Sequence, residues 1–189
     1  KKILVAYDLS DVSRTAWRHA QALAVSCGAE LEVVYVEPWQ GGIDLMPPPS
    51  LTPADVRALR EKISVVVGQD TKITILGGDP ARRVLNLARL HHADMIVVGT
   101  HGRKGLARAV LGSVAEAVII ASPVPVLAAR GAVRPIRSIL APVNFTPYSD
   151  YGFDYAAAAA AVLSAKPLSR PERRHRRARG RGTHPRVAL

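Results

Sequence analysis

The residues of this chain best suited to chemistry are glycines whose spacing suits the binding of phosphate. They follow an apolar stretch that ends at Gly99, in the pattern Gly99-x2-Gly102-x9-Gly112-Ser113. Glycine lets backbone N–H groups approach an anion closely. Gly112-Ser113-Val114 opens a helical pattern, and the first N–H groups of a helix favour negative charge. The Ser113 hydroxyl can donate a further hydrogen bond. These residues predict a site for a polyphosphate.

One acidic residue, Asp8, ends the first apolar stretch of the chain and extends this prediction to a nucleotide. A carboxylate near a nucleotide can accept hydrogen bonds from the ribose hydroxyls. Arg103 and Lys104, in the glycine loop, can screen phosphate charge, and the apolar stretch that includes Val36 can offer backbone groups and a wall to a base. Simpler explanations stay open, because loop glycines can serve turns alone and Asp8 can cap a helix.

Strand-like and helix-like segments alternate along the first 130 residues and must position these groups. Near-continuous apolar runs, typical of buried parallel strands, occupy 1–8, 31–38, 72–76, 93–99 and 123–130. Helical patterns lie between them. This order predicts an α/β domain with an open parallel five-stranded sheet and helices on both faces, a Rossmann-like three-layer α/β/α fold. In the strand order 3-2-1-4-5 the first and fourth strands are neighbours, so Asp8 and Gly99 face one crevice.

Local signals mark the ends of several predicted helices. Ser10 or Ser13 can cap the first helix, and the helix after the third strand begins with an Asp79 cap and Pro80 at its first position. His91, at the end of that helix, is expected to meet only solvent or the helix dipole.

Composition and charge narrow the class of protein. Apolar residues make up 48% of the 189 residues, and a single cysteine, Cys27, excludes an internal disulfide framework. No apolar run reaches the ~18–20 residues that cross a bilayer, and no signal-peptide pattern opens the chain. We therefore expect a cytoplasmic protein with no membrane partner. The net charge of +11 is concentrated in 166–189, which holds nine basic residues and one acidic residue.

A partial second copy of the first strand and helix follows the predicted domain 1–130. An alignment without gaps, starting from Lys1 and Arg137, pairs residues of similar type, among them Leu4 with Leu140, Ser13 with Ser149, Trp17 with Phe153 and Ala20 with Ala156. This repeat predicts one strand and one helix over 137–165, which need the first domain or a partner to be ordered. The segment 166–189 lacks apolar periodicity, so we expect a basic disordered tail or the product of a shifted reading frame.

The glycine pattern, the strand 95–99 before it and Asp8 together resemble the ATP-binding signature of the universal stress protein family. The sequence from Gly78 to Arg130 is similar to that family's second half nearly throughout. The resemblance covers 1–130 as a complete domain. It implies a nucleotide-dependent sensor or adaptor of the stress response that binds ATP, with Mg²⁺ or Mn²⁺ carried by the phosphates. It also implies a homodimer formed through the last strand of the domain, 125–128.

The resemblance further implies a role for each site residue. Asp8 contacts the ribose or adenine side, and Val36 meets the base through its backbone. Ala6 belongs to the same set, at a position where many members have proline. The phosphates are cradled by Gly99, Gly102, Gly112, Ser113 and Val114. The second copy has Asn144 in place of the acid and lacks the glycines, so no second nucleotide site is predicted.

Three other classes of function stay open. One is a phospho-acceptor signalling domain, which needs an acidic cluster at the first and third strands, but the third strand here ends in Gly77-Gly78. A nucleotide-hydrolysing α/β enzyme can share this fold, but no residue is clearly placed to activate water, so no catalytic residue is predicted. ATP pyrophosphatase-like relatives carry a Ser-Gly-Gly-rich loop after the first strand, which the sequence DLSDVS lacks. The arginines of 170–186 can bind nucleic acid non-specifically through phosphate contacts, and such binding would weaken steeply with salt.

Overall fold

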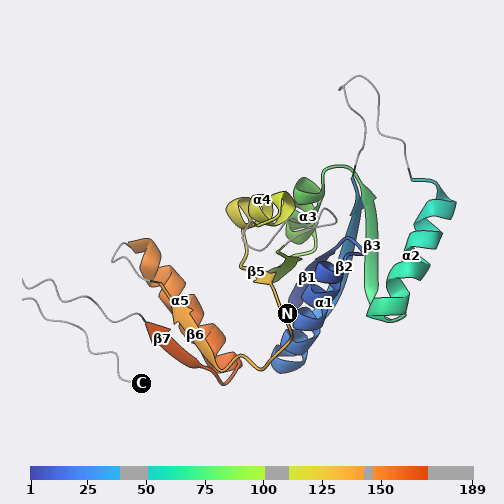
Figure 1. The fold of residues 1–189 in the computed structure, drawn as a ribbon. Helices are drawn as coiled ribbons and strands as arrows, with labels where there is room; N and C mark the ends of the chain where they lie inside the picture. The colour runs from blue at the N-terminus through green and yellow to red at the C-terminus, as the bar shows by residue number, and fades with distance from the viewer. Residues whose placement is uncertain (39–50, 101–110, 143–146, 170–189) are drawn as a thin grey trace, which may run out of the picture. The chain divides into compact units, whose positions relative to one another are not determined.

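The computed structural model describes residues 1–38, 51–100, 111–142 and 147–169. The chain divides into two compact units, Lys1–Pro135 and Ile136–Leu189. In the first unit the elements alternate along the chain in the predicted order (Figure 1): β1 (Lys2–Tyr7), α1 (Asp11–Cys27), β2 (Glu30–Glu37), α2 (Pro53–Val67), β3 (Lys72–Gly77), α3 (Pro80–Leu90), β4 (Met95–Gly99), α4 (Ser113–Ala121) and β5 (Val126–Ala129).

The sheet of the first unit confirms the predicted order. Its five strands are parallel and lie in the order β3-β2-β1-β4-β5. The central strand β1 pairs with β2 on one side and with β4 on the other, where Val5 lies opposite Val97. Because the strands are parallel, the carboxyl ends of β1 and β4 lie at the same edge of the sheet. This is the adjacency on which the predicted crevice depends.

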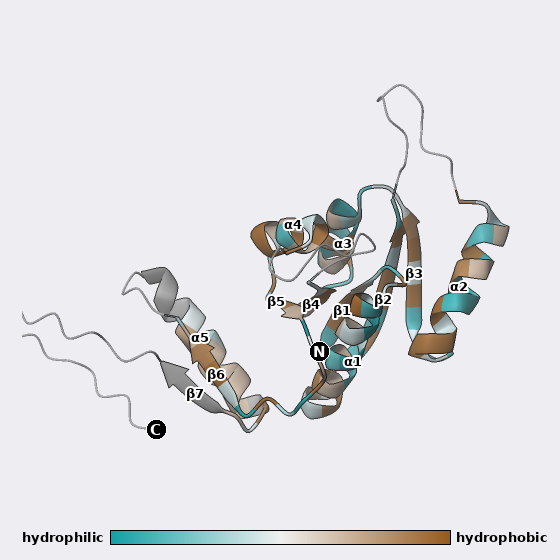
Figure 2. Cartoon of the chain, viewed as in Figure 1, coloured by the Kyte–Doolittle hydropathy of each residue, from teal (hydrophilic) through white to brown (hydrophobic). Residues whose placement is uncertain are grey.

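Helices cover both faces of this sheet, which confirms the three-layer fold. Successive residues of a strand point to opposite faces, so β1 contributes Val5 to one core cluster and Leu4 to another. The first cluster includes Trp17 of α1 and Ile63 of α2, and the second includes residues of α3 and α4 such as Val118. Figure 2 shows the strands largely in brown, as expected for strands that are apolar on both faces.

Capping residues set the helix ends near the site and elsewhere. Ser10 caps α1, since its side chain accepts a hydrogen bond from the Ser13 backbone N–H, and Gly28 ends the helix in the left-handed conformation at φ 60°. Asp79 caps α3 through the Arg82 backbone N–H, with proline at the first position, as predicted. These local bonds satisfy N–H groups that a helix start leaves without partners.

The second unit repeats the start of the first. It contains β6 (Ser138–Ala141), α5 (Pro147–Val162) and β7 (Lys166–Ser169), and β6 and β7 are parallel. Ser138 pairs with Lys166 in the same way that Lys2 pairs with Glu30, a shift of 136 positions in both strands. The repeat therefore extends one strand further than the sequence predicted, because β7 uses the first four residues of the expected tail.

Candidate functional site

The carboxyl edge of the sheet brings the end of β4 against the first turn of α1. A Cβ atom built on Gly99 would lie 2.8 Å from Val12 Cγ1 and 3.2 Å from the Val12 backbone. Real Cβ atoms essentially never lie as close as 2.8 Å to another atom, so any larger residue here would force Val12 to shift. Gly99 thus has a structural role, whether or not it also contacts a ligand.

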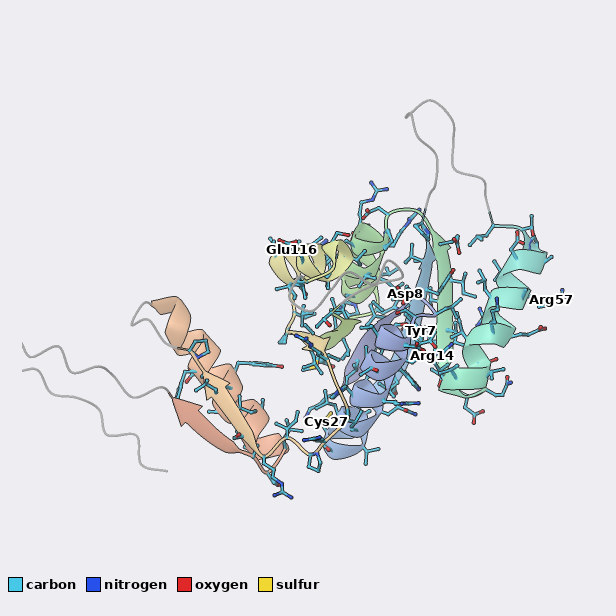
Figure 3. All side chains as sticks on the ribbon, in the orientation of Figure 1. Tyr7, Asp8, Arg14, Cys27, Arg57 and Glu116 are labelled. Carbon is cyan, nitrogen blue, oxygen red and sulfur yellow. The ribbon has the colours of Figure 1, made fainter. Side chains whose placement is uncertain are left out.

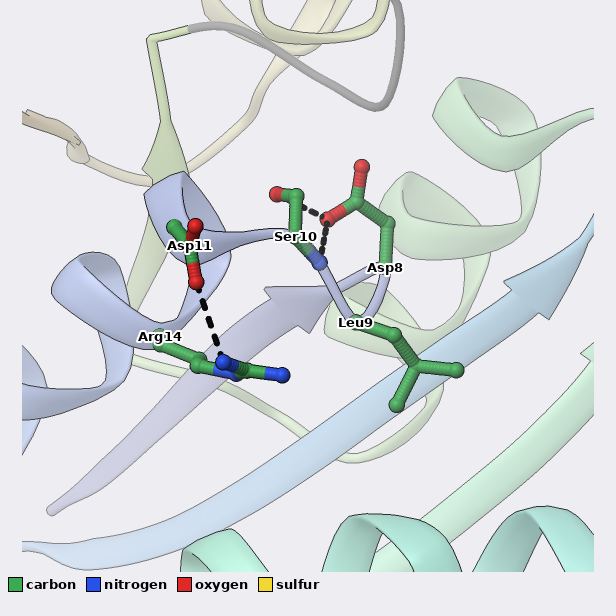
Figure 4. Close-up of a pocket in the computed structure, with 5 residues that line it drawn as sticks. All are labelled: Asp8, Leu9, Ser10, Asp11 and Arg14. Carbon is green, nitrogen blue, oxygen red and sulfur yellow. Dashed lines mark hydrogen bonds and ion pairs between the residues drawn. The ribbon is translucent and has the colours of Figure 1, made fainter.

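Asp8 braces the turn that joins β1 to α1. Its Oδ1 accepts hydrogen bonds from the Ser10 backbone N–H at 3.1 Å and from Ser10 Oγ at 2.5 Å (Figure 4). Ser10 Oγ in turn accepts the Ser13 N–H at 3.1 Å. Asp8 is therefore not the helix cap itself, an alternative that the sequence left open, but it orients the residue that is. Between them, Leu9 has φ 68°, which is rare for a residue with a branched side chain.

An open pocket of about 550 Å3 lies over this turn and is lined by Asp8, Leu9, Ser10, Asp11 and Arg14. Its charged rim is an ion pair in which Arg14 Nη1 lies 3.0 Å from Asp11 Oδ1. Figure 3 shows Asp8 and Arg14 near the same end of the first unit's sheet, and Cys27 at the far end of α1. The pocket therefore lies at the edge where the ends of β1 and β4 meet.

The start of α4 has the form expected of an anion site. Gly112 is the N-cap and makes no side-chain cap bond, Ser113 is exposed, and Val114 is half-buried. A helix start leaves N–H groups without intrahelical partners, and these can bind phosphate oxygens. The Gly112 N–H itself donates to the Thr100 carbonyl at 2.7 Å. That amide is committed within the protein, so Ser113 and Val114 offer the first amides for a ligand.

The two apolar residues of the predicted set are held by the core. Val36 is 6% exposed and Ala6 is half-buried, and both belong to the core cluster on the α3 and α4 face. Their side chains are covered, so only their backbone groups are suited to contact a ligand. Gly102, Arg103 and Lys104 lie outside the described residues.

Two further residues at this edge, Tyr7 and Arg14, are not predicted by the sequence. Tyr7 precedes Asp8 in β1 and is buried in the cluster on the α1 face. Arg14 is one of many basic residues in a helical pattern, and only its position three residues after Asp11 hinted at an ion pair. Nothing in the spacing of either residue distinguished it from core or surface.

The structure also corrects the expectation for His91. Instead of meeting only solvent or the helix dipole, its Nδ1 lies 2.8 Å from Oε2 of Glu32, whose side chain is 2% exposed. Thr74 Oγ1 donates to the same carboxylate at 2.8 Å and Lys72 Nζ at 3.2 Å. Burial raises the pKa of Glu32, but the hydrogen bonds from His91, Thr74 and Lys72 outweigh it and leave the pKa below its ordinary value. This cluster lies at the sheet edge opposite the pocket.

The described residues hold no group of three or more His, Cys, Asp and Glu side chains arranged to bind a metal ion. Within the same residues, no helix is long and apolar enough to cross a membrane.

Comparison with protein families gives a match over residues 1–130 to the model described as the universal stress protein family. Among curated proteins, the chain is 36% identical over 137 residues to universal stress protein MJ0531 of Methanocaldococcus jannaschii, a match that covers 67% of this chain and 80% of that protein.

Solved structures share the fold. Hypothetical protein MJ0577 superimposes with a TM-score of 0.52 at 22% identity, over 71% of this chain and 98% of that one. A universal stress protein crystallised in complex with cAMP superimposes with a TM-score of 0.50 at 25% identity, over 69% of this chain and 97% of that one.

Proposed function

Because the chain belongs to the universal stress protein family, we propose that its first unit binds a nucleotide at the carboxyl edge of β1 and β4. One observation carries this proposal: the Asp8 pocket and the start of α4 belong to the same edge of the sheet. The residue after β4, Thr100, accepts a hydrogen bond from the Gly112 N–H at the start of α4, which has no side-chain cap. A carboxylate for the sugar and helix amides for the phosphates thus belong to one edge of the sheet.

ATP is the proposed ligand, and the site residues divide by the part of ATP that they meet. Asp8 accepts hydrogen bonds from the ribose, and the backbone of Ala6 and Val36 borders the base. The phosphates contact the glycine loop, with Gly99, Gly102 and Gly112 allowing close approach and the amides of Ser113 and Val114 donating. When bound, Mg²⁺ or Mn²⁺ neutralises phosphate charge, and it is carried by the phosphates. The complex with cAMP in a relative of the same fold supports a nucleotide ligand.

We propose a sensor or adaptor role in the stress response, with nucleotide binding as the input. Helix α4 is suited to pass on such an input. The amides at its start are placed to bind a ligand, and Ala115 and Val118 of the same helix pack in the core. Filling the site would then stabilise the folded unit by mass action. This role requires binding and not hydrolysis.

A homodimer through β5 is part of the same proposal. Strand β5 is at the edge of the sheet, so one side of its backbone lacks a partner strand within the described sheet. On the neighbouring helix α4, Ile119 is 41% exposed and Ile120 is 78% exposed. Analytical ultracentrifugation should show a dimer that Ile120→Glu weakens. A monomer at all concentrations would rule the dimer out.

Nucleotide binding is tested by titration calorimetry with ATP. Asp8→Asn keeps an oxygen that can accept the hydrogen bonds from Ser10, but it removes the negative charge of the group to which the ribose hydroxyls would donate. Hydrogen bonds to charged groups contribute about 1.5–3 kcal/mol, so we expect affinity to fall about tenfold or more. Asp70→Asn is the matched control, because Asp70 is an exposed acid in the turn between α2 and β3. Equal affinity of Asp8→Asn and the native protein would remove Asp8 from the site.

The second unit is proposed to be a partial second copy without a nucleotide site. Its pairing register repeats that of β1 with β2, which supports duplication, and Asn144 replaces the acid. Translation of the other reading frames after Ser169 tests whether the copy once continued. A frame that restores alternating strand and helix patterns like those of 38–130 would support a shifted frame, and frames without such a pattern would contradict it.

A further inference from the structure

Two tyrosines lie side by side at the carboxyl end of the sheet, and their hydroxyl groups differ. Tyr7 of β1 and Tyr35 of β2 are register partners on the α1 face, with 3% and 1% of their surface exposed. The Tyr35 hydroxyl donates to Glu37 Oε2. The Tyr7 hydroxyl is buried and makes no hydrogen bond with any described residue. An unpaired buried hydroxyl carries a free-energy cost, and such a group in a folded protein requires an explanation.

The groups around the Tyr7 hydroxyl are those that line the pocket. Burial raises the pKa of Tyr7, the Arg14 guanidinium opposes that rise, and the carboxylates of Asp8 and Asp11 add to it. Arg14 is close enough to act on the hydroxyl, but the geometry between the two falls short of a hydrogen bond. The hydroxyl is therefore buried next to charged groups that line the pocket.

Among the described residues that line the pocket, Arg14 is the one that carries a positive charge. Its side chain is 46% exposed and its partner Asp11 is 92% exposed. An ion pair in such contact with water contributes little to stability. Arg14 can therefore turn from Asp11 towards a ligand at small cost, and its guanidinium carries five N–H donors.

Tyr7 and the proposed phosphate site lie on different faces of the sheet. Successive residues of β1 point to opposite faces of the sheet, and Tyr7 belongs to the cluster on the α1 and α2 face. The proposed phosphate site is at α4, which packs on the other face. A nucleotide with its phosphates at α4 and its ribose at Asp8 has its base at the carboxyl ends of β1 and β2, where the proposed backbone contacts of Ala6 and Val36 lie. Arg14 lines the pocket from the α1 side of these strand ends.

We propose that Arg14 and the Tyr7 hydroxyl anchor the base of the nucleotide, by donating hydrogen bonds to its acceptor atoms. This inference rests on the proposed nucleotide site and adds two contacts to it. Both groups present donors, so they select an edge of the base that carries ring nitrogens or a carbonyl oxygen. Binding also gives the Tyr7 hydroxyl the acceptor that it lacks in the free protein.

Titration of the full chain with AMP and with ATP tests the role of Arg14. Loss of a charged hydrogen bond weakens binding about tenfold, and a contact to the base is the same in both ligands. We therefore expect Arg14→Ala to lose about the same factor for AMP as for ATP. Arg18→Ala is the matched control, because Arg18 is an exposed arginine one helical turn further along α1, and it should bind both ligands as the native protein does.

Other outcomes overturn the inference. A loss that grows from AMP to ATP, or that Arg18→Ala shares, would mean general attraction to phosphate. Unchanged affinity in Arg14→Ala would overturn the anchor while leaving the nucleotide site in place. A native protein that binds neither ligand would overturn the proposed function, and the anchor with it.

Tyr7→Phe gives a second and independent test. Removal of an unpaired buried hydroxyl should raise the melting temperature of the free protein, and loss of the donor should weaken AMP binding several-fold, to about a fifth of the native affinity. Tyr35→Phe is the stability control, because it breaks the bond to Glu37 and should lower the melting temperature. Native affinity for AMP in Tyr7→Phe would exclude Tyr7 from the anchor.

Discussion

The same short sequence pattern occurs in both units of the chain, with very different burial. Leu4 of β1 is 0% exposed, whereas Leu140, its counterpart in β6, is 64% exposed. Trp17 is 2% exposed and its counterpart Phe153 is 37% exposed. One residue of β6 is as well buried as its counterparts in the first unit, since Ala141 is 5% exposed.

The difference shows what a strand gains from its neighbours. Strand β1 has a parallel strand on each side and helices on both faces, whereas the described part of the second unit provides one partner strand and one helix. The described residues of the second unit nevertheless form β6, α5 and β7, with the same pairing register as β1 and β2. Burial of the second face requires elements that are distant in sequence, such as the α3 and α4 that cover Leu4.

The largest effect should come from truncating the paired leucines. Leu4→Ala removes a fully buried side chain, and such changes cost about 2–5 kcal/mol of unfolding free energy. Leu140→Ala should change it by less than about 0.5 kcal/mol, since exposed substitutions have small effects. Urea unfolding measures both. A loss of unfolding free energy in Leu140→Ala as large as that in Leu4→Ala would show that Leu140 is covered in solution. It would contradict the difference in burial between the two units.

Glu32 is a buried carboxylate without an acidic counterpart in the second unit, so the stability of the first unit should depend on pH in the acid range. The counterpart of Glu32 is Leu168. The pKa of Glu32 is lowered in the folded protein, so its stabilising contribution is complete above the carboxyl's ordinary pKa and is lost as the pH falls through the folded value. His91→Ala removes one donor and should cost about 1–3 kcal/mol at neutral pH.

Urea unfolding as a function of pH measures this contribution. Glu32→Gln is the control, because its side chain keeps hydrogen-bonding atoms without a carboxyl proton to gain. Native stability should fall more steeply in acid than that of Glu32→Gln. Parallel curves would mean that Glu32 does not contribute as its contacts indicate.

Two glycines should respond to alanine with opposite signs. Gly99→Ala places a Cβ 2.8 Å from Val12 and should cost about 1–3 kcal/mol, the usual range for overpacking. Gly152→Ala, inside α5, meets nothing within 4 Å and should stabilise its helix by about 0.5–1 kcal/mol. Thermal unfolding measures both, and Val12→Ala should recover part of the loss in Gly99→Ala. A Gly99→Ala protein as stable as the native one would contradict the close approach of α1 to β4.

The sequence predicted the fold well because its signals were local and repeated. Apolar runs, an Asp79-Pro80 helix start and the βα alternation each reflect backbone and burial preferences that act within a few residues. The strand order 3-2-1-4-5 was one of the common orders of doubly wound sheets, and the structure confirms it. His91 was the clear failure, because its partner Glu32 is 59 residues away and reads in sequence as one polar residue in an apolar strand.

The candidate site was predictable only in part. Spacing identified Asp8, Gly99, Gly112 and Ser113, since helix starts and tight turns favour particular residue types. It could not show that the Gly112 amide is already bonded to Thr100, or that Gly99 is required by Val12. Those facts depend on how the chain's separate segments approach one another.

By itself, the sequence determined the elements of the first unit, their order in the sheet, and the glycines and acid placed at one edge, since backbone conformation and alternating burial are encoded locally. Only the tertiary structure decided which polar groups found partners. It gave Tyr35 an acceptor and left Tyr7 without one, buried Glu32 against His91, and exposed Leu140 where Leu4 is covered. Burial and hydrogen bonding of side chains depend on atoms that the fold brings together from distant parts of the chain.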